Sequence, residues 1–166
     1  MEISLLEKTH IRVNFTCEEE SLNDYIKKQV SQEIKKRLAT CFVAVDDAQN
    51  VIGYYTLTSE SLGRDSIPEK YLKKVPTNYN APVILLGWLA RDIRTKGTGI
   101  GEYLLLDALF RCYRLTNESI GAMAVVVDPI NELAKKFYFK YGFIHLPDSQ
   151  KMFLPMNVIA QLKRKL

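Results

Sequence analysis

The chain has 166 residues, of which 47% are hydrophobic and 25% are charged, the balance of an ordinary globular domain. No apolar run approaches the roughly 20 residues needed to span a bilayer, and the N-terminal stretch lacks the features of a signal peptide, so we expect a cytoplasmic protein with no membrane association. The net charge of +4 is compatible with a polyanionic ligand, although a charge of this size does not select one.

Cysteine and histidine are few and widely separated, at Cys17, Cys41, Cys112, His10 and His145. There is no C-x-x-C pair, so a zinc site would have to gather its ligands from unrelated parts of the chain. We therefore expect buried or half-buried reduced thiols and no metal site.

The first half of the chain predicts a helix and a hairpin. Ser21 is the predicted N-cap of the helix, with Asp24 in a variant of the capping box, and apolar residues recur every four positions on one face, at Leu22, Ile26, Val30, Ile34 and Leu38. Residues 40–45 and 51–59 are predicted strands, and the turn-forming residues between them favour an antiparallel hairpin. Residues 63–80 are expected to be a long connection, with a short helix near residues 68–73.

The second half predicts a strand, a helix and a strand. The apolar runs 83–90 and 122–127 are typical of strands buried on both faces. Between them a helix is expected to begin near Gly101, with a core-facing stripe at Leu105, Ala108, Leu109 and Cys112. A crossover helix of this kind places both flanking strands in one sheet.

The C-terminal part predicts three further elements. A helix over residues 131–141 should end at Gly142 as its C-cap, and a short strand near 152–154 and a helix over 158–166 should follow. Together the elements predict one mixed α/β or α+β domain over residues 1–166.

The segment Gly97-Thr98-Gly99-Ile100-Gly101 joins a predicted buried strand to a predicted helix N-terminus. Its three glycines remove Cβ atoms where a ligand would meet the backbone, and the helix presents N–H groups and its positive dipole end there. Such a turn can hold a diphosphate, with Arg94 and Lys96 adding charge-assisted bonds, and a plain tight turn is the alternative. The spacing matches neither the Walker A pattern nor G-x-G-x-x-G, because Glu102 stands where the last glycine would be.

Two motifs resemble those of one enzyme family. Arg94-x-x-Gly97-x-Gly99-x-Gly101 is similar to the R/Q-x-x-G-x-G/A signature of GNAT acetyltransferases, and residues 131–143 are similar to that family's N-x-x-A-x-x-F-Y-x-x-x-G-F block. Over nearly the whole chain the resemblance is to the GNAT toxins of bacterial toxin–antitoxin pairs, through Phe15-x-Cys17 and residues 21–26, 53–57, 86–90 and 152–156. It implies the GNAT fold, a central mixed and mostly antiparallel sheet flanked by helices, and an acetyl-CoA-dependent N-acetyltransferase.

The resemblance also implies roles for individual residues. The backbone of the predicted strand would contact pantetheine and the acetyl group, the glycine turn would hold the diphosphate, and Asn131 would either bind pantetheine or act as a helix N-cap. Tyr138 would be the general acid that protonates the CoA thiolate, whereas Tyr141, Trp88 and the Leu89 side chain are interpreted as packing residues. The implied acetyl-CoA contacts are Leu89, Ala90, Arg91, Arg94, Lys96, Gly97, Thr98, Gly99, Ile100, Gly101 and Asn131.

Members of this branch acetylate the α-amine of an amino acid carried on tRNA and so block translation, which is the implied activity. Two departures, Glu18 in place of the usual glycine and Trp88 in place of the usual arginine, leave the amino acid open. A small amine or a protein N-terminus is the alternative acceptor, and a binding module without catalysis is a third interpretation. No general base stands out in the sequence, and an α-amine, with a pKa of about 7.7–8.0 against about 10.4 for lysine, needs little help.

The branch also implies partners: charged tRNA, a ribbon-helix-helix antitoxin and a second copy of the chain. Basic residues form either a solvated surface or a phosphate-contacting surface at Lys27, Lys28, Lys35, Lys36, Arg37, Lys73 and Lys74.

Overall fold

The computed structural model describes residues 2–166. Its strands are β1 (Ile3–Leu5), β2 (Thr40–Val45), β3 (Val51–Leu62), β4 (Ala81–Arg91), β5 (Ala124–Val127), β6 (Ile144–His145) and β7 (Met152–Pro155). They form one seven-stranded sheet in the order β1-β2-β3-β4-β5-β7-β6. β4 and β5 run parallel, whereas the pairs β1–β2, β2–β3, β5–β7 and β6–β7 run antiparallel. The predicted mixed, mostly antiparallel sheet is therefore confirmed.

The main helices are α1 (Glu20–Asp24), α2 (Val30–Lys35), α3 (Glu69–Leu72), α4 (Ile100–Glu118), α5 (Glu132–Lys140) and α6 (Met156–Arg164). The chain divides into two compact units, one formed by Met1–Thr58 with Gly87–Ala108 and the other by Ser59–Leu86 with Leu109–Leu166. Strands β3 and β4 and helix α4 each contribute residues to both units. That one domain spans residues 1–166 stays a prediction.

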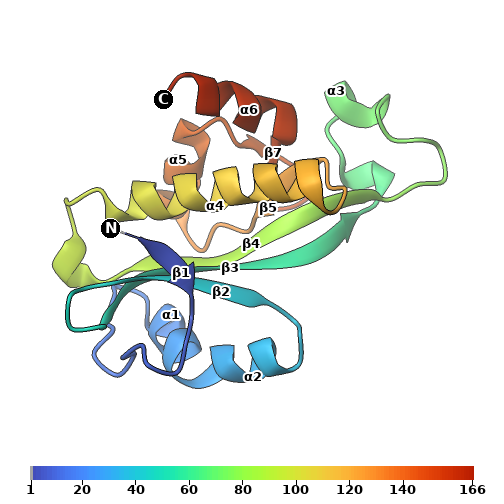
Figure 1. Cartoon of the computed structure of the whole chain (residues 1–166). Helices are drawn as coiled ribbons and strands as arrows, with labels where there is room; N and C mark the ends of the chain where they lie inside the picture. Colours follow the sequence, from blue (N-terminus) through green and yellow to red (C-terminus); the bar gives the residue numbers. More distant parts are fainter. Residues whose placement is uncertain (1) are drawn as a thin grey trace. The chain divides into compact units, whose positions relative to one another are not determined.

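The first unit packs a helical segment and the start of α4 against β2 and β3. Figure 1 shows α1 and α2 on the opposite side of these strands from α4. The core on the α1 side contains Tyr25, Ile26, Val30 and Tyr54, all fully buried. On the other side, a Cβ atom at Gly53 would lie 2.7 Å from Leu104 Cδ1, so glycine is what allows α4 to approach β3 closely.

The start and the apolar stripe of the first helix differ from prediction. The helix begins at Glu20 with Glu19 as N-cap and without a side-chain capping bond, so the predicted cap at Ser21 is wrong. A π-helical turn, Tyr25–Gln29, joins α1 to α2. Ile34 and Leu38 are 36% and 57% exposed and do not join the core. A spacing of four exceeds the 3.6 residues of an α-helical turn, so the stripe drifts, and Leu38 also lies beyond the end of α2 at Lys35.

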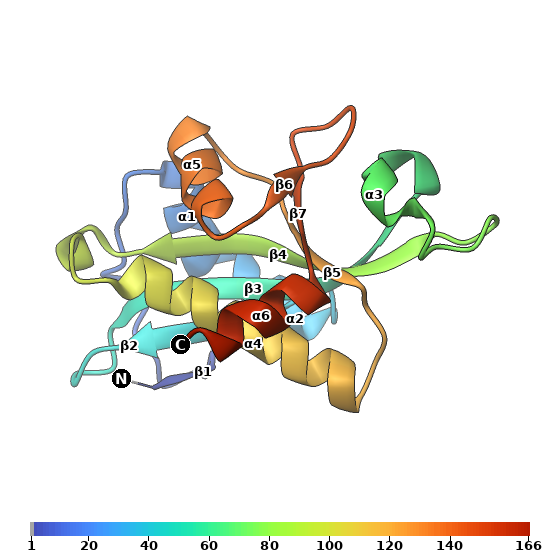
Figure 2. The ribbon, with the colours of Figure 1, turned by 90° about the horizontal axis from the view of Figure 1, so that it is seen from above.

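The second unit is built on β5 and β7. Val83–Leu86 of β4 pair with Ala124–Val127 of β5, which in turn pair with Met152–Pro155 of β7. The parallel β4–β5 pair confirms the predicted crossover through α4, whose predicted core residues are all buried: Leu105, Ala108, Leu109 and Cys112. In Figure 2 the chain passes from α5 through the short strands β6 and β7 into α6.

Most other predicted elements agree with the structure. The hairpin is confirmed, with the first strand at its predicted bounds and the second extended to Leu62. Strand β1, with three residues, was not predicted. The cysteines are free, with Cys41 and Cys112 buried and Cys17 partly exposed, as expected. Within residues 2–166 no helix is long and apolar enough to cross a membrane, and no group of three or more His, Cys, Asp or Glu could hold a metal ion.

Candidate active site

The strand residues that are predicted to bind acetyl-CoA lie in the last part of β4. The β4–β5 pairing stops at Leu86 and Val127, whereas β4 continues for five more residues, 87–91. Leu89, Ala90 and Arg91 belong to this extension. Strand residues that have lost their neighbour present backbone N–H and C=O groups that can pair with another molecule. This arrangement is compatible with the backbone role that we predict for these three residues.

The residues beside this extension fix its geometry. The Trp88 backbone N–H donates to Thr56 Oγ1 over 3.0 Å, and Thr56 is buried, so a side-chain hydroxyl takes up a backbone donor of β4. The Trp88 ring stacks on Tyr25, with ring centroids 4.4 Å apart and an interplanar angle of 13°. Tyr25 in turn donates from its hydroxyl to Glu33 Oε1 over 3.0 Å. Trp88 is therefore packed against the core on the α1 side, as we expect of a packing residue.

The glycine turn requires glycine for its backbone conformation. Gly97 and Gly99 have φ angles of +80° and +85°, a region that L-residues with a Cβ rarely occupy. A Cβ at either position would have no atom within 4 Å, so crowding inside the chain is not the reason for glycine here. Open space above two left-handed glycines leaves room for a ligand to reach the backbone. The Gly99 carbonyl accepts from Tyr103 N over 3.0 Å, which begins α4 directly after the turn.

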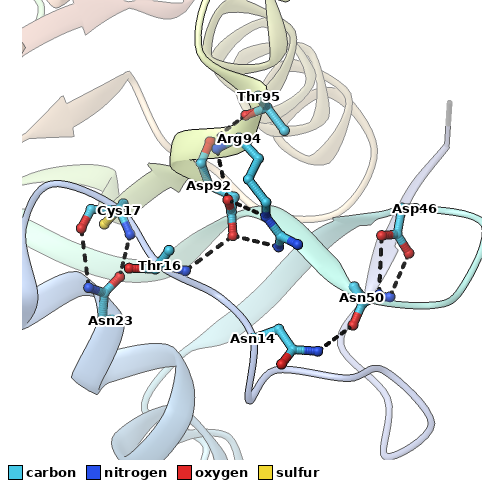
Figure 3. Close-up of polar contacts among 9 residues, drawn as sticks. All are labelled: Asn14, Thr16, Cys17, Asn23, Asp46, Asn50, Asp92, Arg94 and Thr95. Carbon is cyan, nitrogen blue, oxygen red and sulfur yellow. Dashed lines mark hydrogen bonds and ion pairs between the residues drawn. The ribbon is translucent and has the colours of Figure 1, made fainter.

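A buried carboxylate, Asp92, holds the segment that precedes this turn in place (Figure 3). Its side chain has no exposed surface. Its Oδ2 accepts from the Thr16 N–H over 3.1 Å, and its Oδ1 accepts from the Arg94 N–H over 2.9 Å. The Arg94 guanidinium adds two bonds of 2.8 Å, from Nε to Oδ1 and from Nη2 to Oδ2. Burial alone would raise the pKa of Asp92, but these bonds outweigh it and hold the pKa below its ordinary value.

The backbone of Asp92 anchors the same segment. Its N–H donates to the Ile52 carbonyl over 2.8 Å, and its carbonyl accepts from the N–H and the hydroxyl of Thr95 over 2.9 and 2.7 Å. Ile93 N donates to the Thr16 carbonyl over 2.8 Å. The start of the turn is thereby bonded both to β3 and to the loop that precedes α1.

Arg94 is bonded to the protein and also exposed. Its hydrogen bonds to Asp92 raise the pKa of the guanidinium, which carries five N–H donors and uses two of them in these bonds. Its side chain is 52% exposed, and Lys96 is exposed as well. Arg94 therefore positions the turn, and the predicted phosphate contact of its remaining donors is compatible with this geometry.

The Arg91 side chain was not predicted to matter, since only its backbone was expected to act. Its Nη2 lies 3.5 Å from Glu18 Oε1, and its Nη1 is buried with no hydrogen-bond partner among residues 2–166. A Cβ at Gly101 would lie 3.8 Å from Arg91 Cδ, so the Arg91 side chain runs beside the first turn of α4. Glu18, which stands where members of this branch usually have glycine, thus forms an ion pair with Arg91.

In the second unit, α5 carries the other two predicted site residues. Asn131 is the N-cap of α5, since its side chain accepts from the Ala134 N–H over 2.9 Å. The N-cap interpretation is confirmed, and the pantetheine bond stays a prediction. Gly142, with φ +97°, follows the helix end as predicted, after Tyr141.

Tyr138 lies in a cluster of aromatic rings and is 8% exposed. Its ring makes edge contacts with Phe137 and Phe143 at centroid distances of 5.5 and 5.4 Å. Burial raises the pKa of the Tyr138 phenol above its ordinary value. The phenol keeps its proton at neutral pH with or without this shift in pKa, since a tyrosine ordinarily titrates at about pH 10. Tyr141 packs on Phe137 with centroids 5.6 Å apart, which agrees with its interpretation as a packing residue.

The structure thus brings the predicted site residues together as two sets. Leu89 to Gly101 form a continuous strand, turn and helix start in the first unit, whereas Asn131 and Tyr138 share α5 in the second. Asp92 was missed because a single carboxylate after a strand has no distinctive pattern. Its position two residues before an arginine, where it accepts that residue's N–H, is the one local signal that could have indicated it.

Curated relatives have related activities. The chain is 35% identical over 130 residues to a tRNA-acetylating toxin of Mycobacterium tuberculosis (strain ATCC 25618 / H37Rv), covering 78% of this chain and 76% of the relative. It is 29% identical over 162 residues to a probable toxin TacT of Sinorhizobium fredii (strain NBRC 101917 / NGR234), covering 92% and 89%. No family model matches the chain.

Solved structures of similar fold cover nearly the whole chain. AtaT complexed with acetyl-methionyl-tRNAfMet has a TM-score of 0.89 at 27% identity, covering 98% of each chain. AtaTR bound with AcCoA has a TM-score of 0.85 at 27% identity, covering 98% of this chain and 97% of that one. A KacTA–DNA complex has a TM-score of 0.82 at 28% identity, covering 99% of each. The fold, the two motifs and these similarities agree: the chain belongs to the GNAT acetyltransferases that act as tRNA-acetylating toxins of toxin–antitoxin systems.

Proposed function

We propose that the chain transfers the acetyl group of acetyl-CoA to the α-amine of an amino acid carried on tRNA, and thereby blocks translation. The observation that carries the proposal is the turn with two left-handed glycines, fixed by Asp92 directly before α4. A turn of this form suits the diphosphate of CoA. The tRNA-acetylating relative and the AtaT complex with acetyl-methionyl-tRNAfMet support an aminoacyl acceptor.

Acetyl-CoA would be held by backbone groups and by two cations. The N–H groups of residues 97–101 would donate to the diphosphate, and Arg94 and Lys96 would add charge-assisted bonds. The extension of β4 at Leu89, Ala90 and Arg91 would pair with the amide groups of the pantetheine arm. The AcCoA-bound neighbour supports this co-substrate.

In the reaction the neutral amine attacks the thioester carbonyl, a C–N bond forms and the C–S bond breaks. Tyr138 would donate its proton to the departing CoA thiolate, and the proton that the nitrogen loses would restore the phenol. The phenol is neutral when the reaction begins, because a tyrosine ordinarily titrates at about pH 10 and burial raises the pKa of Tyr138 further. No covalent enzyme intermediate is needed.

The tRNA would be bound through phosphates at exposed basic residues. In the first unit these are Lys27, Lys28, Lys35, Lys36 and Arg37, and in the second they are Lys73 and Lys74. Neutralising phosphates releases counterions, so binding should weaken as salt rises. A smaller acceptor, such as a free amine, would show little salt dependence.

The proposed function also implies protein partners. We propose a ribbon-helix-helix antitoxin that masks the active site, which the KacTA–DNA complex supports because such antitoxins bind DNA. We also propose a homodimer. Since the reaction needs charged tRNA and acetyl-CoA, we propose that the enzyme acts in the cytoplasm.

The decisive experiment incubates a pool of charged tRNA with the enzyme and acetyl-CoA, and identifies acetylated aminoacyl ends by mass spectrometry. Tyr138→Phe should lower the rate by about 10²–10⁴-fold, the usual contribution of a positioned general acid, with unchanged acetyl-CoA affinity. Tyr141→Phe, three residues along the same helix, is the matched control and should retain activity. Absence of acetylated tRNA with the wild-type protein, at intact acetyl-CoA affinity, would refute the aminoacyl acceptor and favour a small amine or a protein N-terminus.

A further inference from the structure

Arg91, the last residue of β4, carries a side chain that reaches from one face of the sheet to the other within the first unit. Ala90 belongs to the core on the α1 side, and successive side chains of a strand point to opposite faces, so Arg91 leaves β4 toward α4. In agreement, Arg91 Cδ would lie 3.8 Å from a Cβ at Gly101, in the first turn of α4. The guanidinium nevertheless meets Glu18, two residues before α1, with 3.5 Å between Nη2 and Oε1.

The guanidinium passes β4 along its free edge. The opposite edge is covered by β3, since the Asp92 N–H donates to the Ile52 carbonyl over 2.8 Å. The free edge is the one that β5 has left, because the β4–β5 pairing stops at Leu86. We propose above that acetyl-CoA binds along this edge, with its diphosphate at the start of α4. The Arg91 side chain therefore lies beside the proposed diphosphate site.

The contact between Arg91 and Glu18 is loose enough to be exchanged. Its 3.5 Å exceeds the roughly 2.7–2.9 Å of a charge-assisted hydrogen bond, and the two side chains are 28% and 47% exposed, so the ion pair contributes little to stability. The arrangement also leaves Arg91 Nη1 without a hydrogen-bond partner among residues 2–166. A diphosphate offers several acceptor oxygens, and a guanidinium binds phosphate through two parallel N–H bonds.

We propose that the Arg91 guanidinium exchanges Glu18 for the diphosphate of acetyl-CoA when this co-substrate binds. The inference rests on the proposed function, since it adds a third cation, beside Arg94 and Lys96, to the same site. Rotation about the side-chain bonds of Arg91 is sufficient, because its Cδ already lies beside the first turn of α4. In the free protein Glu18 holds the guanidinium at the free edge, and it competes with the diphosphate for it.

The exchange predicts opposite effects for the two partners. Arg91→Met removes charge-assisted bonds to phosphate and should weaken acetyl-CoA binding by about ten-fold. Glu18→Gln removes the competitor and should tighten binding by about two-fold, the scale of an exposed ion pair. A pair that only held the loop and the strand in place would weaken binding when either partner is lost.

Calorimetric titration with acetyl-CoA measures both effects. Lys8→Met, at an exposed cation of the same unit in the turn after β1, is the control and should bind acetyl-CoA as the wild type does. Glu18→Gln preserves the size of a half-exposed side chain, so the test does not depend on whether Arg91→Met folds. Weaker binding in Glu18→Gln, or unchanged binding in Arg91→Met, would overturn the inference.

A second titration uses acetylated dephospho-CoA, which keeps the diphosphate and lacks the 3′-phosphate. Arg91→Met should lose the same factor of about ten for this ligand as for acetyl-CoA. A loss confined to acetyl-CoA would assign Arg91 to the 3′-phosphate and would also overturn the inference. Wild-type binding of acetyl-CoA and acetylation of charged tRNA would in these cases leave the proposed function intact, whereas a wild type that does not bind acetyl-CoA would refute the function itself.

Discussion

The two parts of the candidate site are fixed by different interactions. In the first unit, the glycine turn is held by hydrogen bonds that converge on Asp92, from Thr16, Arg94 and the neighbouring backbone. In the second unit, Tyr138 is held by contacts with aromatic rings. The first arrangement keeps the backbone of a ligand-binding turn in a rare conformation. The second removes water from a phenol and so raises its pKa.

The difference matches what each part has to do. A diphosphate is recognised by the direction of N–H groups, so the turn must be rigid although it is exposed, and polar bonds provide that rigidity. A general acid must present its proton in a fixed position, and the ring contacts of Tyr138 provide that position, while burial also makes its phenol a weaker acid. Changes in the first unit should therefore act on acetyl-CoA affinity, and changes at Tyr138 should act on the chemical step.

The largest effect is expected for Asp92→Ala. It removes the acceptor of four hydrogen bonds, two of them from the Arg94 guanidinium. Loss of a buried carboxylate with charged partners should lower the free energy of unfolding by about 3 kcal/mol and weaken acetyl-CoA binding by at least about ten-fold. Urea unfolding and calorimetric titration with acetyl-CoA measure the two effects.

The control for this change is Asp24→Ala, which removes a carboxylate of α1 whose Oδ1 lies 3.4 Å from Lys28 Nζ. It should leave acetyl-CoA affinity unchanged. Tyr138→Phe provides the contrast, because it keeps the ring contacts and should alter the free energy of unfolding by less than about 1 kcal/mol. Unchanged acetyl-CoA affinity in Asp92→Ala would show that the hydrogen bonds to Asp92 are not needed for the glycine turn to bind acetyl-CoA.

A smaller effect is expected for Gly99→Ala. At φ +85° an alanine is strained, and the left-handed conformation should cost about 1–2 kcal/mol of folding stability. A Cβ at Gly99 would meet no atom of the chain within 4 Å. A loss of acetyl-CoA affinity in this variant would therefore indicate that the ligand itself approaches the backbone at Gly99. We expect affinity to fall by about ten-fold, equivalent to about 1.4 kcal/mol.

Gly63→Ala is the matched control, since Gly63 also has open space around it but an ordinary φ of −64°. It should change neither stability nor affinity. If Gly99→Ala lowers stability and leaves affinity as in Gly63→Ala, the turn needs glycine for its own conformation alone.

The sequence predicted the parts of the molecule that depend on local patterns. The β2–β3 hairpin and the core face of α4 follow from periodicity and turn chemistry and agree with the structure, whereas the C-cap of α5 is Tyr141 and the predicted Gly142 is the left-handed residue that follows it. Tyr138 was singled out by its motif, and its burial is compatible with the assigned role. Strand β1 was missed because three residues carry too little pattern, and its pairing with β2 is a long-range contact.

The residues that sequence reasoning missed act through long-range partners. Asp92 is bonded to Thr16, which lies 76 positions away, and no local pattern announces such a bond. The Arg91 side chain pairs with Glu18, which belongs to another segment that only the fold brings beside β4. A lone carboxylate in a sequence has too many possible partners for its role to be inferred before the fold is known.

The smallest expected effect is on the pH dependence of the free energy of unfolding. It arises from two buried thiols, Cys41 in the first unit and Cys112 in the second. Burial raises the pKa of each thiol from 9.0 to about 12. In the unfolded chain the thiols ionise near pH 9, whereas in the folded chain they stay protonated, so stability is fully present below pH 9 and falls as pH rises toward 12. Between pH 8 and pH 10 each thiol should lower the free energy of unfolding by about 1.4 kcal/mol.

Urea unfolding of Cys41→Ala and Cys112→Ala at both pH values measures these contributions, because each variant should lose less stability with pH than the wild type. Cys17→Ala is the control, since Cys17 is partly exposed and should change the pH dependence least. Equal changes for Cys41 and Cys112 would mean that both units exclude water equally well around a titratable side chain. A change confined to Cys41 would show that water reaches the Cys112 thiol in the folded chain.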